Sequence, residues 1–141
     1  MNLRYATEND IPLLAEFNHQ LIEDERAPNP MTVRELARRM AGWFEADYRA
    51  VVFETNSTPV AYALFRDAEN GIYLRQFYVA REHRRSGIGT SAIRLFRERV
   101  VPTDRSLSLE VLSHNEVGIA FWRAVGFHEH AISFRIDPSH G

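Results

Sequence analysis

Hydrophobic residues in the first part of the chain are spaced as in helices. A short strand is expected at residues 3–5, and Thr7 with Asp10 three positions later then forms a helix-start signature. Apolar residues follow at helical spacing, at Leu13, Leu14, Phe17, Leu21 and Ile22. The charged segment 23–30 contains two prolines and is expected to end this helix as a loop.

A second amphipathic helix is predicted after Thr32. Glu35 completes a capping box with Thr32, and Met31 can pack on Leu36 across the first turn. The apolar positions of this helix are Val33, Leu36, Ala37, Met40, Trp43 and Phe44. Their spacing predicts one buried face, so this helix should pack against another layer of structure.

The spacing of apolar residues then changes to that of strands. β-branched and aromatic runs at residues 50–53 and 60–65 flank a turn at residues 55–58, which together predict a hairpin. Residues 70–71, Asn-Gly, supply the next turn. The segment after it, I-Y-L-R-Q-F-Y-V at residues 72–79, is the strongest strand candidate of the chain.

Helix and strand patterns alternate in the next part of the chain. Residues 88–100 have helical spacing and are followed by Pro102, and residues 107–111 alternate as in a strand. A helix joins the strands at 72–79 and 107–111, so we expect these two strands to be parallel, with a right-handed crossover. The earlier hairpins are expected to be antiparallel.

One more helix and one more strand are predicted near the end. Residues 117–124 have helical spacing, and Gly126 is expected to end that helix in a left-handed conformation, with Phe127 folding back. Residues 131–136 are predicted to close the chain as a strand. The fold class is therefore α/β (α+β): a twisted, mostly antiparallel mixed sheet with helices on both faces, about four in all. We expect a single domain over residues 1–141.

Composition narrows the chemistry that the chain can perform. A chain of 141 residues with 45% apolar and 11% aromatic residues can bury one sizeable core. Its formal net charge of -2 gives no reason to expect nucleic acid as a partner. It has no cysteine, which excludes a disulfide framework, a thiolate metal site and a cysteine nucleophile. No stretch resembles a signal peptide or a spanning helix, so we expect a cytoplasmic protein without membrane contacts.

The segment between the strand at 72–79 and the helix at 88–100 resembles a phosphate-binding turn. It reads R-R-S-G-I-G over residues 84–89 and leads into a helix, where unpaired N–H groups and the helix dipole attract anions. Gly87 and Gly89 would let the backbone approach a pyrophosphate closely. The residues expected to hold the pyrophosphate are Arg84, Arg85, Ser86, Gly87, Ile88, Gly89 and Thr90. The alternative is a plain glycine turn with two solvated arginines; neither the P-loop nor the Rossmann pattern is present.

Two segments resemble the GNAT superfamily of N-acetyltransferases. Residues 79–90, V-A-R-E-H-R-R-S-G-I-G-T, are similar to the superfamily's signature, in which a glycine-containing loop after Arg or Gln follows a strand ending in Val. Residues 109–127, L-E-V-L-S-H-N-E-V-G-I-A-F-W-R-A-V-G-F, resemble its later strand and helix. Both segments occur in the superfamily's order and spacing, and the expected elements match over essentially the whole chain.

The resemblance implies that acetyl-CoA binds in a wedge between two splayed strands, one ending at Val79 and the other at residues 107–112. It implies that backbone groups of Phe77 and Val79 hold the pantetheine arm and the thioester, while residues 84–90 hold the pyrophosphate. Asn115 would contact the cofactor arm, and its alternative role is to cap the helix that follows.

Members of the superfamily pass the acetyl group directly to an amine, which must first lose a proton. An amine with a pKa near 10.4 lies about 3.4 units above pH 7, a cost of roughly 4.6 kcal/mol, so a base or a water relay is needed. Glu110 resembles the base of the ribosomal-protein N-terminal acetyltransferases. The alternative for Glu110 is a glutamate on the sheet surface or in a salt bridge.

The superfamily's usual proton donor is replaced in this chain. Trp122 stands where many relatives carry a tyrosine, and indole cannot act as a general acid. Trp122 is expected to pack on the cofactor arm or to fill the inner face of its helix. Tyr78, beside the wedge, is the replacement donor to test, with a core position as its alternative. Arg75 and Gln76 lie where polyamine acetyltransferases carry acidic residues, which argues against a polyamine acceptor.

Two functional hypotheses follow from the resemblance. The first is an N-acetyltransferase that moves acetyl from acetyl-CoA to a primary amine of a small molecule or a peptide. The second, motivated by Trp122, is a non-catalytic sensor or regulatory domain that binds acyl-CoA. His128 and His130 have no third ligand in reach by spacing, so we expect no metal. Edge strands of the sheet allow a homodimer.

Overall fold

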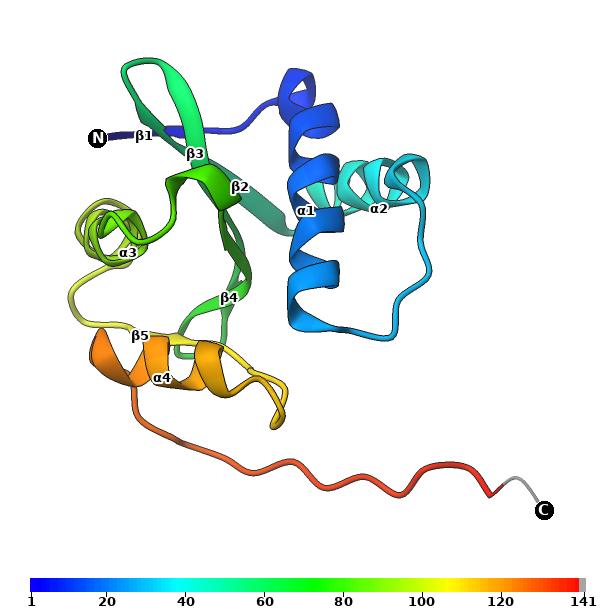
Figure 1. Cartoon of the computed structure of the whole chain (residues 1–141). Helices are drawn as coiled ribbons and strands as arrows, with labels where there is room; N and C mark the ends of the chain where they lie inside the picture. Colours follow the sequence, from blue (N-terminus) through cyan, green and yellow to red (C-terminus); the bar gives the residue numbers. More distant parts are fainter. Residues whose placement is uncertain (140–141) are drawn as a thin grey trace. The chain divides into compact units, whose positions relative to one another are not determined.

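The computed structural model describes residues 1–139, and contacts divide the chain into two compact units, Met1–Glu110 and Val111–Gly141 (Figure 1). The first unit contains β1 (Asn2–Tyr5), α1 (Ile11–Glu25), α2 (Val33–Glu45), β2 (Tyr48–Thr55), β3 (Thr58–Ala68), β4 (Gly71–Val79), α3 (Ile88–Arg99) and β5 (Ser106–Ser108). The second unit contains α4 (Glu116–Ala124). Two short 3-10 turns, Glu8–Asp10 and Arg81–His83, precede α1 and follow β4. The order of these elements agrees with the predicted order as far as α4.

The five strands form one sheet in the order β1-β2-β3-β4-β5. The first four strands pair antiparallel, whereas β4 and β5 pair parallel, which confirms the mixed sheet with one parallel pair. The parallel ladder joins Gly71, Ile72 and Tyr73 to Ser106, Leu107 and Ser108. Beyond Tyr73, β4 continues to Val79 without β5 beside it. The pairing of β4 with β5 therefore ends at Tyr73 and Ser108, and the wedge between the two strands stays a prediction.

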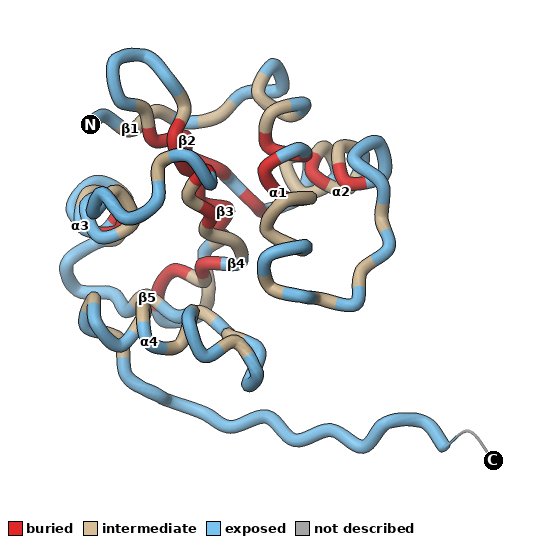
Figure 2. Tube along the Cα trace, viewed as in Figure 1, coloured by how far each residue is buried: buried red, intermediate tan, exposed pale blue. Residues whose placement is uncertain are grey.

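Helices cover both faces of the sheet in the first unit, as predicted. On one face, α1 and α2 place Leu14, Phe17 and Met40 in a cluster with buried residues of the strands (Figure 1). On the other face, the Phe96 ring of α3 lies 5.1 Å from the Phe65 ring of β3, edge to face. Figure 2 shows the consequence: the buried stretches follow the middle strands and the inner sides of the helices.

Local hydrogen bonds explain where the elements begin and end. Thr32 and Glu35 form the predicted capping box, with N–O distances of 3.0 and 3.2 Å. The turn between β2 and β3 is closed by Asn56 and Ser57, which both have positive φ angles, 51° and 65°. Helix α1 runs to Glu25, so it includes the first three residues of the segment 23–30 that was expected to be a loop.

The second unit contains a helix whose two ends match the predictions. Asn115 caps α4 by accepting a hydrogen bond from the Gly118 N–H at 3.0 Å. Gly126 has a φ of 109°, and the Phe127 N–H donates to the Trp122 carbonyl at 3.0 Å, which confirms the left-handed end and the returning chain.

Two strand predictions are corrected by the structure. The strand expected at residues 107–112 is shorter and covers Ser106–Ser108, because its pairing with β4 ends there. The prediction of a strand at residues 131–136 is wrong, because this segment pairs with no strand of the described chain. Its alternating apolar side chains, Ile132, Phe134 and Ile136, are 80%, 93% and 97% exposed. Alternation alone cannot form a strand, because a strand needs a neighbouring backbone for its hydrogen bonds.

Candidate functional site

The turn before α3 presents backbone N–H groups that no side chain of the described residues caps. Gly87 is the N-cap residue, and the N–H of Ser91 makes the first helical hydrogen bond to its carbonyl at 3.0 Å. The N–H groups of Ile88, Gly89 and Thr90 therefore precede the helical hydrogen-bond ladder. Together with the helix dipole, these three donors form an end that attracts an anion.

The shape of this turn depends on two left-handed residues. Arg85 has a φ of 66° and Gly87 a φ of 77°, a conformation that favours glycine. A Cβ atom at Gly87 would meet nothing within 4 Å, so the backbone there is open to an approaching group. The Ser86 hydroxyl donates to the His83 carbonyl at 2.8 Å and so stabilises the turn itself. The turn fits a pyrophosphate by its donors and its open backbone, and that role stays a prediction.

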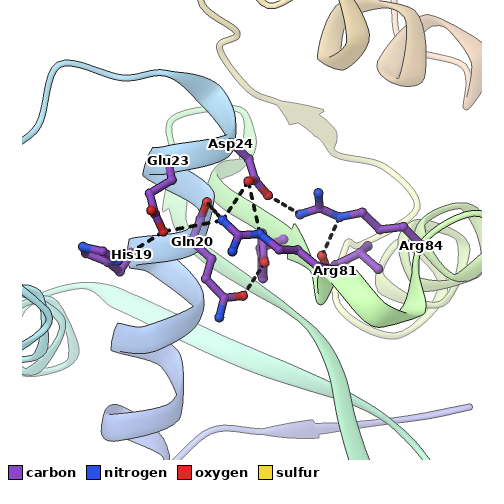
Figure 3. A network of polar contacts seen from close by, with 8 residues as sticks. His19, Gln20, Glu23, Asp24, Arg81 and Arg84 are labelled. Carbon is purple, nitrogen blue, oxygen red and sulfur yellow. Dashed lines mark hydrogen bonds and ion pairs between the residues drawn. The ribbon is translucent and has the colours of Figure 1, made fainter.

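A carboxylate near the end of α1 holds two arginines of the segment that follows β4 (Figure 3). Asp24 accepts a hydrogen bond from Arg84 at 2.6 Å and others from Arg81 at 2.9 and 3.2 Å. Burial of Asp24 would raise its pKa, but the hydrogen bonds from Arg81 and Arg84 outweigh burial and lower it. Arg84 also donates to the Val79 carbonyl at 3.0 Å. Asp24 and Val79 engage Nη2 and Nε of Arg84, so Nη1 carries the donors with which Arg84 would meet a pyrophosphate, a role that stays a prediction.

Tyr78 lies in the hydrophobic core, with an exposed fraction of 2%. Its ring contacts the Phe17 ring at 5.4 Å, and the Arg84 guanidinium lies 5.1 Å from its centroid. Its hydroxyl donates to the Gln20 side-chain oxygen at 2.5 Å. Burial raises the pKa of Tyr78, which keeps the hydroxyl protonated at neutral pH. Tyr78 thus has the core position that was given as the alternative to a catalytic role. The role of Tyr78 as a proton donor stays a prediction.

The end of β4 supplies the backbone expected to hold the pantetheine arm. Phe77 and Val79 pair with Ala63 and Ala61 of β3 on one side. On their other side, no described residue of β5 pairs with them, because the last β4–β5 pair joins Tyr73 to Ser108. The Val79 carbonyl already accepts from Arg84, and its second lone pair leaves room for one further donor.

Glu110 follows β5 and contacts the sheet through a tyrosine of β4. The Tyr73 hydroxyl donates to a Glu110 carboxylate oxygen at 2.8 Å. Burial, followed by this hydrogen bond, raises the pKa of Tyr73 to about 12. The salt-bridge alternative for Glu110 is not seen among residues 1–139. The structure thus brings Glu110 to Tyr73, a residue that the sequence patterns did not single out.

Two further predicted residues belong to the second unit. Asn115 caps α4, which confirms the alternative proposed for it and leaves its contact with the cofactor arm a prediction. The Trp122 ring packs edge to face on Phe121 and Phe127, with centroids 4.9 and 5.2 Å away. Trp122 thus contributes to the packing of its own helix, and its place at the cofactor is untested.

Metal ligands do not gather anywhere in the described part of the chain. No three His, Cys, Asp or Glu side chains among residues 1–139 are close enough to hold a metal ion. No helix within the same residues is long and apolar enough to cross a bilayer. The candidate site consists of the turn before α3, the end of β4 and the Tyr73–Glu110 pair.

Known proteins share the sequence pattern and the fold of this chain. A model of the family described as "Acetyltransferase (GNAT) family" matches residues 14–127. The thialysine N-epsilon-acetyltransferase of Bos taurus is 29% identical over 139 residues, which cover 88% of this chain and 82% of that protein.

Solved structures repeat the fold over nearly the whole chain. A possible acetyltransferase from Clostridium difficile 630 has a TM-score of 0.76 at 19% identity, covering 99% of this chain and 98% of that one. An aminoglycoside 6'-N-acetyltransferase from Acinetobacter haemolyticus, without ligand, has a TM-score of 0.74 at 16% identity, covering 100% of both chains. An acetyltransferase from Clostridium acetobutylicum, solved with acetyl-CoA, has a TM-score of 0.68 at 20% identity, covering 96% and 95%.

Proposed function

Since the chain belongs to the acetyltransferase (GNAT) family, we propose that it transfers acetyl from acetyl-CoA directly to a primary amine of a small molecule or a peptide. The observation that carries this proposal is the uncapped start of α3, which offers three N–H donors to a pyrophosphate. The Clostridium acetobutylicum structure with acetyl-CoA, which has the same fold, supports acetyl-CoA as the donor. The bovine relative is named for thialysine, an amine, and supports an amine as acceptor.

We assign two segments of this chain to binding of the cofactor. The turn from Arg84 to Thr90 binds the pyrophosphate, and its two arginines, Arg84 and Arg85, supply the positive charge. The end of β4, at Phe77 and Val79, binds the pantetheine arm through the backbone edge that β5 leaves uncovered. When bound, acetyl-CoA supplies an acyl group on a thiol that leaves readily, because a thiol of pKa about 8.5 ionises close to neutral pH.

Glu110 is the proposed general base. Its carboxylate would accept a proton from the ammonium form of the acceptor, which frees the nitrogen lone pair to attack the thioester carbonyl. The C–S bond then breaks, the thiolate departs, and the second amine proton passes to solvent. The Tyr73 hydroxyl fixes one carboxylate oxygen at 2.8 Å and leaves the other oxygen for the amine.

The test of this assignment is thiol release from acetyl-CoA, measured over a panel of primary amines with wild type and Glu110→Gln. We expect the variant to lose about 10²- to 10⁴-fold in kcat, the range typical of general bases. Glu98→Gln removes an exposed carboxylate from α3 and serves as the matched control, with wild-type rates. Equal rates for Glu110→Gln and wild type would show that another group, or water, takes the proton.

A second function, an acyl-CoA sensor, is favoured by one observation. The residue that stands for the usual proton donor is Trp122, and the hydroxyl of the replacement, Tyr78, is already bonded to Gln20. Tight binding of CoA by calorimetry, with no turnover of any amine, would support the sensor and contradict the enzyme.

Three broader proposals accompany the function. We propose that residues 1–141 act as one domain, that the protein is cytoplasmic, and that it forms a homodimer through a sheet edge. Light scattering coupled to size exclusion gives the mass in solution, and a monomer mass at micromolar concentration would contradict the dimer.

A further inference from the structure

Three arginines meet on the face of the sheet that α1 and α2 cover, and none of them forms an ion pair with a carboxylate among the described residues, 1–139. Arg39 comes from α2, Arg66 from β3 and Arg75 from β4. The guanidiniums of Arg39 and Arg75 lie 4.5 and 4.8 Å from the centroid of the Trp43 ring. Arg66 and Arg75 each donate to the Tyr48 hydroxyl at 3.2 Å. We call these five residues the arginine cluster.

The absence of carboxylates distinguishes this cluster from the other arginines that are bonded across the fold. Arg4 forms ion pairs with Asp10 and Glu54, and Arg81 and Arg84 both form ion pairs with Asp24. Among residues 1–139, no carboxylate lies within ion-pair distance of any arginine of the cluster. The hydrogen bond with Tyr48 and the charge of Asp47 raise the pKa of Arg66, so the positive charge of the cluster is partly compensated, but no anion of the described residues is directly paired with it.

Buried donors without partners provide a second, independent observation. Asn18 is 1% exposed, and its side-chain oxygen accepts from Arg39 at 3.2 Å. The Asn18 Nδ2 and the Arg39 Nε are both buried and have no hydrogen-bond partner among the described residues. Burial lowers the pKa of Arg39, and the charge of Arg75 lowers it further. Buried donors of this kind need an acceptor, and an anion would satisfy both the donors and the charge.

Direct contacts connect the cluster to the proposed base. Glu110 accepts from Tyr73, whose ring lies 5.0 Å from the Arg66 guanidinium. Arg66 and Arg75 then share the Tyr48 hydroxyl. The proposed base is therefore joined to the cationic cluster by contacts through Tyr73, all within the first unit.

We infer that the arginine cluster binds a carboxylate of the acceptor, so that the acceptor is an amino acid or a similar amine that carries a negative charge. This inference rests on the proposed function, since it names the acceptor class of that site. Guanidiniums match the planar fork of a carboxylate, and the Trp43 ring holds those of Arg39 and Arg75 close together. The carboxylate at the cluster would leave the distal amine free to reach Glu110.

The experiment compares amines that differ only in the carboxylate. Lysine, ornithine and 2,4-diaminobutyrate are each measured against the corresponding amide, and cadaverine serves as the amine without either group. We expect kcat/KM to be about 10- to 100-fold higher for the carboxylates, mainly through KM, as for hydrogen bonds to a charged group. One spacing within the series should be best, because the cluster and Glu110 are fixed in the fold.

Variants of the cluster provide the decisive comparison. Arg75→Gln and Arg39→Gln should lower kcat/KM for the carboxylate to about that for the amide, so that the ratio between the two falls toward one. Arg75→Lys retains a charge and should keep part of the preference. Arg38→Gln removes an exposed neighbour on α2 and is the matched control, with the preference intact. Urea unfolding of each variant verifies that it folds.

A binding measurement separates this inference from the proposed function. Calorimetry with lysine and lysinamide, in the presence of CoA, reports the carboxylate preference without turnover. Acetylation of carboxylates and amides at equal rates, or a preference that survives Arg75→Gln, would overturn the inference while the acetyltransferase stands. Tighter binding of lysine that Arg75→Gln abolishes, without turnover of any amine, would support the anion site and contradict the enzyme. Equal binding of lysine and lysinamide without turnover would contradict both.

Discussion

Replacement of Asp24 by asparagine tests how the end of α1 is held to the segment after β4. Asp24 accepts from Arg84 at 2.6 Å and from Arg81 at 2.9 Å. Asparagine has nearly the same shape, so Asp24→Asn removes the negative charge and leaves two guanidiniums facing a neutral amide. The variant therefore measures the charge of this carboxylate with little change in packing.

The magnitude follows from the exposure of the three side chains. A hydrogen bond to a charged group contributes about 1.5–3 kcal/mol, whereas an exposed ion pair contributes about 0–1 kcal/mol. The exposed fractions are 27% for Asp24, 45% for Arg81 and 40% for Arg84, so solvent screens part of the interaction. We expect Asp24→Asn to lower the free energy of unfolding by about 1–2 kcal/mol and the Tm by about 4–8 °C.

The assay is urea unfolding of wild type and variant between pH 7 and pH 3. The folded-state pKa of Asp24 lies below its unfolded value, which is about 3.9. The carboxylate therefore stabilises the fold above the unfolded pKa, and this contribution is lost as the pH falls through the folded pKa. The difference between wild type and Asp24→Asn should be complete from pH 7 to 5 and should shrink below about pH 4.

Glu23→Gln is the matched control, because Glu23 contacts the same Arg81 at 3.5 Å and is 55% exposed. We expect it to change the free energy of unfolding by less than about 0.5 kcal/mol. Equal losses for Asp24→Asn and Glu23→Gln at pH 7 would refute the reasoning. So would an Asp24→Asn deficit of the same size at pH 3 and pH 7.

Three further substitutions test the scaffold that carries the site. Thr32→Ala removes the acceptor of the Glu35 N–H and should lower the free energy of unfolding by about 1 kcal/mol, measured by urea titration of the circular dichroism signal. Phe96→Ala removes a fully buried ring of α3 and should cost about 3–5 kcal/mol, seen as a large fall in Tm; a loss below 1 kcal/mol would contradict the packing. Gly71→Ala would place a Cβ atom 2.0 Å from the Ser106 carbonyl oxygen, so amides of β5 should exchange hydrogen faster while those of β2 and β3 keep their protection.

Local patterns predicted most of the fold, because the interactions they report lie within one element. The capping box joins Thr32 to Glu35, three residues away, and the end of α4 depends on Gly126 and its neighbours. The segment 131–136 shows the limit of such patterns. Its alternation is that of a strand, but a strand forms only where another backbone supplies hydrogen bonds, and the local sequence carries no information about that neighbour.

The same distinction divides the candidate site. The turn at residues 84–90 is one continuous segment, so its glycines and the helix after it could be found in the sequence. The start of that helix was predicted within one residue. Asp24, which holds Arg84, is 60 residues away, and Tyr73 meets Glu110 from 37 residues away. Neither pairing has a local signal, because both depend on the register of β4 and on the position of α1.

The local charge of the arginine cluster, like the contacts of the site, depends on the fold and not on the local sequence. The chain has 17 Lys and Arg against 19 Asp and Glu, and this near balance argued only against a polyanion partner. The overall balance does not show how the charges are distributed. Asp24 pairs with both Arg81 and Arg84, while Arg39 and Arg75 contact one indole ring and have no carboxylate partner among the described residues. In the sequence, Arg75 stands where polyamine acetyltransferases carry an acidic residue, which argued against a polyamine acceptor. In the fold, Arg75 lies beside Arg39 of α2, because both guanidiniums contact the Trp43 ring. Two cations at one place would repel a polyamine and, as we infer, attract the carboxylate of the acceptor.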